Sequence, residues 1–206
     1  MGGNALSVPT TRISSAQYHA LVPQLEQQLR AVFGVRAQVV PAYRSKEDFG
    51  DIDIVLEHPS APQHQHQPLI DFAQQHWHSR VAHANNAVLS VEHRPDTQAA
   101  EGVQVDLLLA PPQDFDAMVH YFSYNDLGNL IGRVAHKMGL EYGHRGLLYH
   151  WRDGTHLFRT LTVTQNTTQS LRTLGYDPAI FYAGFEHLED VFAYAASSPY
   201  FNPTLY

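Results

Sequence analysis

Residues 51–56, Asp-Ile-Asp-Ile-Val-Leu, constrain the fold of this chain more than any other stretch. In a β-strand, side chains two positions apart point to the same face. Asp51 and Asp53 therefore share one face, and the isoleucines that alternate with them share the other. Two adjacent carboxylates repel each other unless a cation lies between them. Because carboxylate oxygens are the natural ligands of Mg²⁺ and Mn²⁺, the stretch predicts a half-buried strand that carries a divalent-cation site.

A third aspartate, Asp106, lies within residues 103–109, Val-Gln-Val-Asp-Leu-Leu-Leu, which also have the pattern of a strand. If the two strands are neighbours, three carboxylates converge on one point. That is a ligand set for two cations about 4 Å apart, which clamp the attacking and leaving oxygens of a phosphoryl displacement. An isolated Asp-x-Asp is more often an ordinary solvated sheet face, so the surrounding residues decide between the two interpretations.

The turn before the first strand has the residues to cradle a triphosphate: Arg44, Ser45, Lys46 and, at its end, Gly50. Residues 44–53 resemble the glycine/serine-to-Asp-x-Asp signature of the DNA polymerase beta superfamily of nucleotidyltransferases. That family opens the motif with Gly-Ser or Gly-Gly, whereas this chain has Pro41-Ala42 or, with a shifted gap, Arg44-Ser45. The departure concerns the triphosphate loop and leaves the expected metal ligands intact.

A second resemblance lies in residues 121–133. They are similar to the family X polymerase segment Tyr-Phe-x-Gly-x-Asp-x-x-Asn-x-x-x-Arg, which begins the thumb and lines the nucleotide pocket. The matching positions are Tyr121, Phe122, Asp126, Asn129 and Arg133. The last three recur at i, i+3 and i+7, so they share one face of a helix. Tyr124 stands where the family has glycine, and it is expected to crowd the edge of the nucleotide or to reshape the turn.

The resemblance covers residues 35–206 and implies a palm and a thumb. It implies a mixed α+β fold, with a nucleotidyltransferase palm sheet and flanking helices in residues 1–122 and a small thumb-like subdomain in residues 123–206. It also implies two Mg²⁺ or Mn²⁺ ions, bridged by Asp51 and Asp53, with Asp106 binding only the ion that carries the nucleophile. The family's lyase domain and DNA-gripping fingers motifs have no counterpart, as in small viral and bacteriophage members.

The remaining elements follow from periodicity and turn residues. Ser14 or Ser15 is expected to cap a helix that Gly34 stops, with Pro23 either kinking it or marking the first turn of a second helix. Strands are expected at residues 35–40 and 88–93, and helices at 69–84, 111–119 and 125–139. His64 and His66 fall in a Pro- and His-rich loop at 58–68, which predicts a solvated segment. Residues 147–162 predict a β-hairpin around Asp153-Gly154, and three short helices follow.

Charge sets the kind of partner. The chain of 206 residues has a net charge of −7 and no cysteine, which excludes disulfides and thiolate metal sites. Residues 133–172 hold 6 basic and 2 acidic side chains, while residues 1–132 hold 7 and 14. Such a chain does not coat nucleic acid, but its one basic segment, residues 133–172, is expected to hold a DNA or RNA 3′ end weakly. No apolar run approaches the roughly 18 residues of a membrane span, and a monomer in the cytoplasm (the host cytoplasm if viral) is expected.

These observations predict a metal-dependent nucleotidyltransferase that moves a nucleoside monophosphate from a (deoxy)nucleoside triphosphate to an acceptor hydroxyl and releases pyrophosphate. A minimal family X-like polymerase or end-adding enzyme, acting on a nucleic-acid 3′-hydroxyl, fits best. Transfer to a small-molecule or protein hydroxyl is an open alternative. A non-catalytic nucleotide or nucleic-acid binding module of the same fold is another, and a ligand-free interaction protein is a third. The acceptor, template dependence, sugar preference and oligomeric state stay open.

Overall fold

The computed structural model describes residues 3–58, 66–86 and 88–205. The chain divides into two compact units, which are described separately. Unit 1 consists of Met1–Val39 and Glu47–Pro112, and unit 2 of Val40–Lys46 and Gln113–Tyr206. The predicted mixed α+β class is confirmed. The boundary expected between residues 122 and 123 lies inside unit 2, and a short segment at 40–46 belongs to unit 2 although unit 1 surrounds it in sequence.

Unit 1 is built on a five-stranded sheet of order β2-β4-β7-β6-β5. The strands are β2 (Ala37–Val39), β4 (Asp51–Glu57), β7 (Val103–Ala110), β6 (Val88–His93) and β5 (Ala82–Asn85). β4 and β7 run parallel, and the other neighbours are antiparallel. The expectation that the strand containing Asp106 lies beside the strand containing Asp51 is therefore confirmed.

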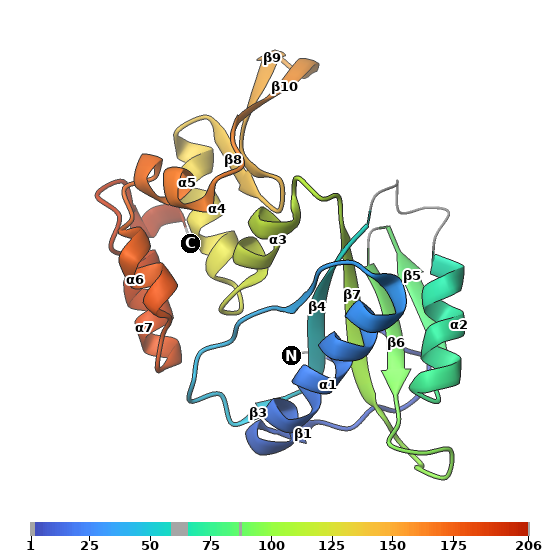
Figure 1. Ribbon diagram of the computed structural model, residues 1–206. Helices are drawn as coiled ribbons and strands as arrows, with labels where there is room; N and C mark the ends of the chain where they lie inside the picture. Colours follow the sequence, from blue (N-terminus) through green and yellow to red (C-terminus); the bar gives the residue numbers. More distant parts are fainter. Residues whose placement is uncertain (1–2, 59–65, 87, 206) are drawn as a thin grey trace. The chain divides into compact units, whose positions relative to one another are not determined.

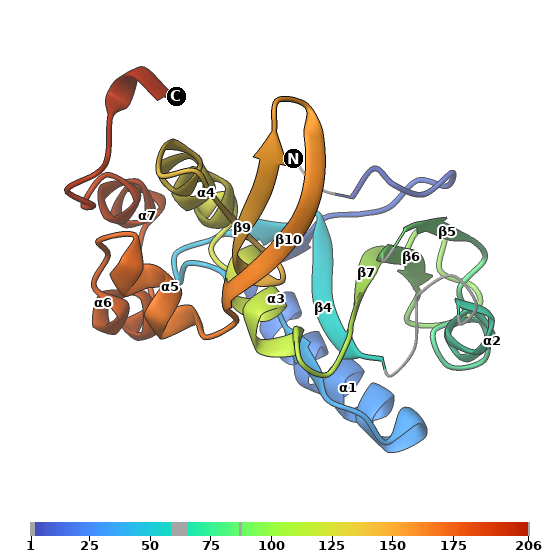
Figure 2. The same ribbon diagram turned by 90° about the horizontal axis from the view of Figure 1, so that it is seen from above.

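Two helices cover one face of this sheet, α1 (Ser15–Phe33) and α2 (His66–His76). Ser14 caps α1 in a capping box with Gln17, and Gly34 ends it at φ 65°. Pro23 lies inside α1, so the helix is continuous rather than divided. Figures 1 and 2 show both helices on the same side of the sheet. The ring centroids of Phe33 in α1 and Phe72 in α2 are 5.4 Å apart.

The sequence prediction is wrong after residue 76. The helix expected over 69–84 ends at His76, and residues 82–85 form the edge strand β5 instead. His78 has φ 52°, a left-handed conformation that no helix continues through. A second sheet of two short strands, β1 (Ile13–Ser14) and β3 (Asp48–Phe49), was not expected from the sequence. His66 is the first residue of α2, and His64 lies outside the described residues.

Unit 2 combines helices with a three-stranded antiparallel sheet of order β10-β9-β8. Its elements are α3 (Phe115–Phe122), α4 (Leu127–Lys137), β8 (Leu140–Gly143), β9 (Gly146–Asp153), β10 (His156–Thr164), α5 (Thr167–Thr173), α6 (Pro178–Ala183), α7 (Leu188–Ala195) and the 3₁₀ helix η2 (Pro203–Leu205). The predicted hairpin and the three short helices after it are confirmed. Asn166 caps α5 and Asp177 caps α6.

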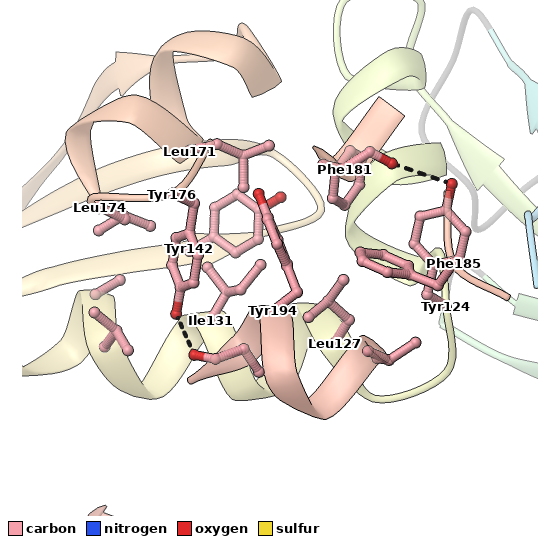
Figure 3. Close-up of a cluster of buried hydrophobic side chains, with 14 of the residues drawn as sticks. Tyr124, Leu127, Ile131, Tyr142, Leu171, Leu174, Tyr176, Phe181, Phe185 and Tyr194 are labelled. Carbon is pink, nitrogen blue, oxygen red and sulfur yellow. Dashed lines mark hydrogen bonds between the residues drawn. The ribbon is translucent and has the colours of Figure 1, made fainter. Parts of the chain in front are cut away.

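The core of unit 2 forms where the buried face of α4 meets the C-terminal helices (Figure 3). Leu127 and Ile131 pack there against Phe181 and Tyr194. The segment at 40–46 is tied to this unit by its backbone: the N–H of Arg44 donates to the carbonyl of Phe185 at 3.0 Å. None of the helices in the described residues is long and apolar enough to cross a membrane.

Candidate active site

The three predicted aspartates lie on one face of the unit 1 sheet. In the parallel pairing of β4 with β7, Asp53 is directly opposite Asp106, and Asp51 is opposite Gln104. Paired residues on neighbouring strands point to the same face, and such strands are about 4.8 Å apart. Ile52 and Ile54 are buried on the face that α1 and α2 cover, while Asp51 and Asp53 are partly exposed. The alternation in the sequence therefore places the carboxylates on the open face.

Two neutral side chains hold the Asp106 carboxylate. The Nε2 amide of Gln104 donates to both oxygens of Asp106, at 3.0 and 2.9 Å. Ser90, which is opposite Asp106 on β6, also donates a hydrogen bond to the Asp106 carboxylate. Burial raises the pKa of Asp106, and the negative charge of Asp51 raises it further, whereas the two donors oppose the shift. A carboxylate in this position gains from a nearby positive charge.

The N-terminal arm, residues 3–11, hydrogen-bonds along the same row of side chains. The N–H of Gly3 donates to Oδ2 of Asp51 at 3.0 Å, and the N–H of Ala5 donates to Oε1 of Gln104 at 2.9 Å. Gly3 has φ 85°, and a Cβ there would lie 2.3 Å from the carbonyl oxygen of Gly50. Glycine is therefore required for the arm to approach Asp51 so closely. The bond to Ala5 also fixes the Gln104 amide with its nitrogen toward Asp106.

The donor chemistry fits a hard divalent cation, since Asp51, Asp53 and Asp106 offer only carboxylate oxygens. Neither Asp51 nor Asp106 forms a salt bridge within the described residues. Among those residues, however, no three histidine, cysteine or acidic side chains lie close enough to form a ready-made metal cage. The three aspartates lie on one face of the sheet, and Asp53 is paired with Asp106. Their carboxylates must move closer together to coordinate one cation.

A fourth acidic residue on this face is held quite differently. Glu92 on β6 is opposite Gln104 and fully buried. Arg80 donates to both of its carboxylate oxygens, and Arg94 lies 3.7 Å away. Burial alone would raise the pKa of Glu92, but the hydrogen bonds and charges of the two arginines outweigh it and hold the pKa below its usual value. The charge of Glu92 is thus compensated by protein cations.

The predicted nucleotide-binding residues of the second motif lie in unit 2. Tyr121 and Phe122 end α3 with their rings 5.1 Å apart, and the hydroxyl of Tyr121 donates to Oδ1 of Asn129 at 2.8 Å. Asp126 precedes α4, and Asp126, Asn129 and Arg133 are all exposed. The prediction that these three residues share one face of a helix is confirmed, and that face is exposed.

Tyr124, which stands where the polymerase segment that residues 121–133 resemble has glycine, has a left-handed backbone with φ 61°. A non-glycine residue in this conformation costs about 1–2 kcal/mol. The ring compensates by packing edge-on against Phe181 and Phe185, and its hydroxyl donates to the carbonyl of Phe181 at 3.3 Å (Figure 3). Tyr124 is only 8% exposed, so the ring turns into the core of unit 2 and the turn keeps its left-handed shape.

The predicted triphosphate loop is divided between the units. Arg44, Ser45 and Lys46 belong to unit 2, and Gly50 belongs to unit 1 next to Gly3. The guanidinium of Arg44 donates to the carbonyl of Ala183 and lies 3.5 Å from Glu186, while Oγ of Ser45 is 3.0 Å from Nδ1 of His187. A phosphate at Arg44 would have to exchange these partners.

Three site residues were missed from the sequence: Gly3, Ser90 and Gln104. Gln104 had a usable signal, because it stands two positions before Asp106 on the same strand face. Ser90 required the β6–β7 register, and Gly3 required a contact 48 residues away in sequence. A scan against family models and a search of curated proteins found no match to this sequence.

Proposed function

We propose that this protein is a metal-dependent nucleotidyltransferase whose active site is the open sheet face of unit 1. The observation that carries the proposal is the β4–β7 register, which sets Asp53 opposite Asp106 with Asp51 two residues away. The two sequence motifs point to the same reaction class. Two divalent cations bound here would supply charge to neutralise a triphosphate and to lower the pKa of an acceptor hydroxyl.

The chain's own residues have distinct roles in this proposal. Asp51 and Asp53 hold the triphosphate end of the site, and Asp106 lies nearest the acceptor. The acceptor oxygen bonds to the α-phosphorus, the bond from that phosphorus to the bridging oxygen breaks, and pyrophosphate leaves. The hydroxyl proton goes to Asp106 or to solvent. Chemistry of this kind depends on positioning and on charge stabilisation more than on covalent help from the protein.

Gln104 and Ser90 contribute by orienting Asp106. Their donors fix the plane of its carboxylate in the absence of any cation. Outer hydrogen bonds of this kind orient metal ligands and tune their affinity. Gln104 also connects the carboxylate to the backbone of Ala5, so the N-terminal arm and the carboxylates form one hydrogen-bonded row.

The direct test is transfer of label from α-³²P nucleoside triphosphates, with Mg²⁺ or Mn²⁺, to a panel of DNA, RNA and small-molecule hydroxyls. Asp53→Asn should lower transfer by about a hundredfold or more, because it removes a charge that the transition state needs. The matched control is Glu101→Gln, an exposed acidic residue of the same unit, which should leave transfer unchanged. Equal activity of wild type and Asp53→Asn would refute the proposal.

Nucleotide binding by unit 2 is a separate part of the proposal, supported by the hydrogen bond between the partly buried Tyr121 and the exposed Asn129. A ligand that binds only the native state raises the melting temperature. Triphosphate with Mg²⁺ should therefore raise it, and Asn129→Ala should reduce that rise while leaving the ligand-free melting temperature nearly unchanged. A rise that Asn129→Ala and Tyr121→Ala both leave intact would place the nucleotide elsewhere.

A further inference from the structure

The β9–β10 hairpin of unit 2 has one face made of aromatic side chains and an arginine. Its antiparallel register pairs Tyr149 with Leu161 and Trp151 with Arg159, so all four point to the same side. A register shift between Leu157 and Arg159 brings Phe158 beside them, with its ring 5.7 Å from that of Trp151. We call this group the hairpin face: Tyr149, Trp151, Phe158, Arg159 and Leu161.

The hairpin face is unusually exposed for such apolar side chains. Trp151 is 55% exposed, Phe158 56% and Tyr149 43%. β8 pairs with β9 only as far as Tyr149, so the tip beyond it is a ribbon of two strands (Figure 1). A two-stranded ribbon has no core of its own in which to bury these rings. Contiguous exposed apolar groups with polar neighbours are typical of interaction sites.

The charge around this face selects an anionic partner. The hairpin and the residue before it hold Arg145, Arg152 and Arg159 against one acidic residue, Asp153, whereas the whole chain has a net charge of −7. The basic character is therefore local. Arginine next to exposed aromatic rings offers both a phosphate contact and a stacking surface. A purely apolar surface would use the rings but not the arginines, and an acidic surface without apolar groups would use the arginines but not the rings.

The spacing of the rings favours bases that are not stacked on one another. Tyr149 and Trp151 are two residues apart on one strand, which places them about 7 Å apart. Bases within a duplex are about 3.4 Å apart along each strand, so they cannot stack on both rings. We propose that the hairpin face binds single-stranded nucleic acid, with bases stacked on Tyr149 and Trp151 and phosphates paired with Arg159.

A second copy of this chain is a poorer occupant. A two-fold symmetric contact through the hairpin face would bring the same surface together from both copies. The arginines of the two copies would then lie against each other, with only Asp153 to offset them on each side. Like charges within a desolvated contact oppose association. A nucleic-acid strand carries a negative charge at every phosphate and has an apolar face on every base, so it satisfies both features at once.

This inference rests on the proposed function only in giving the bound strand a role, that of the acceptor whose 3′-hydroxyl is extended. Binding itself requires no triphosphate and no metal. It can therefore be measured in EDTA and in an Asp53→Asn background, where the proposed transfer reaction cannot run. Failure of strand binding and failure of transfer are thus separate results.

Tryptophan fluorescence gives a direct readout. The chain has two tryptophans, of which Trp77 is fully buried and Trp151 exposed, so a base stacked on the hairpin should quench Trp151 alone. Titration with a 12-nucleotide single strand at low salt should quench the emission with about micromolar affinity, and a duplex of the same length should bind more weakly. The Trp151→Phe variant should keep the affinity, measured by anisotropy of a labelled strand, and lose the quenching.

Two variants separate the contributions. The Trp151→Ala substitution should weaken single-strand binding about tenfold, as expected for the loss of one stacked base. The Arg159→Gln substitution should reduce the slope of log K against log salt concentration by about the amount that one phosphate contact contributes. The matched control is Phe192→Ala in α7, a ring exposed to 52% outside the hairpin, which should bind as wild type does. The inference fails if Trp151→Ala binds as wild type, if the duplex binds more tightly, or if sedimentation shows a dimer that Trp151→Ala dissociates.

Discussion

Two acidic groups on one face of the same sheet are stabilised in opposite ways. Glu92 is fully buried, and two arginines compensate its charge. Asp106 lies one strand away and Asp51 two strands away. They receive hydrogen bonds from neutral donors, a side-chain amide and a backbone N–H, and form no salt bridge within the described residues. The first arrangement is complete without a ligand. The second leaves negative charge that a divalent cation can neutralise, which is why the site is assigned to the aspartates.

The largest expected contrast is in catalysis. Asp106→Asn should lower nucleotidyl transfer by about a hundredfold or more, because it removes the carboxylate that we propose lies nearest the acceptor. Its free energy of unfolding should stay equal or rise, since burial already raises the pKa of Asp106 and the neutral amide avoids that cost. Transfer assays and urea unfolding of the same preparation check both halves. A large stability loss with intact transfer would reverse the roles assigned here.

The complementary substitution should act on stability. Glu92→Gln leaves Arg80 and Arg94 without their counter-charge, and Arg94 is only 11% exposed in its side chain. Breaking a buried pair costs about 3–5 kcal/mol, and the partial exposure of Arg80 reduces the expected loss to about 2–3 kcal/mol. Urea unfolding followed by emission of the buried Trp77 measures it in unit 1. Transfer per folded molecule should change less than about twofold, and a hundredfold loss would make Glu92 part of the active site.

A smaller effect is expected at Gln104, which lies between the aspartates and Glu92 on the sheet. Gln104 is opposite both Asp51 and Glu92, and it holds Asp106. Gln104→Met keeps the length of the side chain but removes the amide, so transfer should fall about tenfold, as outer-shell substitutions do. Adding excess Mn²⁺ should restore part of this loss. Gln98→Met, at an exposed position, is the control, and an unchanged rate in Gln104→Met would remove Gln104 from the site.

The smallest contrast is in the response to acid. The folded-state pKa of Glu92 lies below its unfolded value of about 4.3, so its contribution to stability is complete above that pH. The contribution is lost as the pH falls through the folded pKa. The stability difference between wild type and Glu92→Gln should therefore be largest at neutral pH and shrink below about pH 4. A difference that grows toward acid would mean that the arginines do not hold Glu92 ionised.

The sequence predicted what depends on local periodicity and missed what depends on distant pairing. β4 was predicted from the alternation of aspartate and isoleucine in residues 51–56, and β7 from the short apolar run at residues 103–109. β5 was missed because a two-sided polar edge strand has no alternation and its residues continue a helical pattern. The segment at 40–46 joins unit 2 through bonds to residues about 140 positions later, which no local pattern encodes.

The candidate site shows the same division. The aspartates were proposed as ligands from their spacing together with the resemblance of the surrounding residues, and the shared face of Asp51 and Asp53 followed from the two-residue period of a strand. The register that sets Asp53 opposite Asp106, instead of one residue away, came only from the structure. Tyr124 was singled out because the polymerase segment that residues 121–133 resemble has glycine there, but neither its left-handed backbone nor the burial of its ring against Phe181 and Phe185 was predicted.

Mn²⁺ titration monitored by electron paramagnetic resonance tests directly whether the three aspartates, and not Glu92, bind divalent cations. Free Mn²⁺ loses its signal when it binds, so affinity is measured without substrate or turnover. The account predicts that wild type and Glu92→Gln bind Mn²⁺ alike and that Asp53→Asn binds more than about tenfold more weakly. Equal binding by wild type and Asp53→Asn, or no binding by wild type, would contradict it.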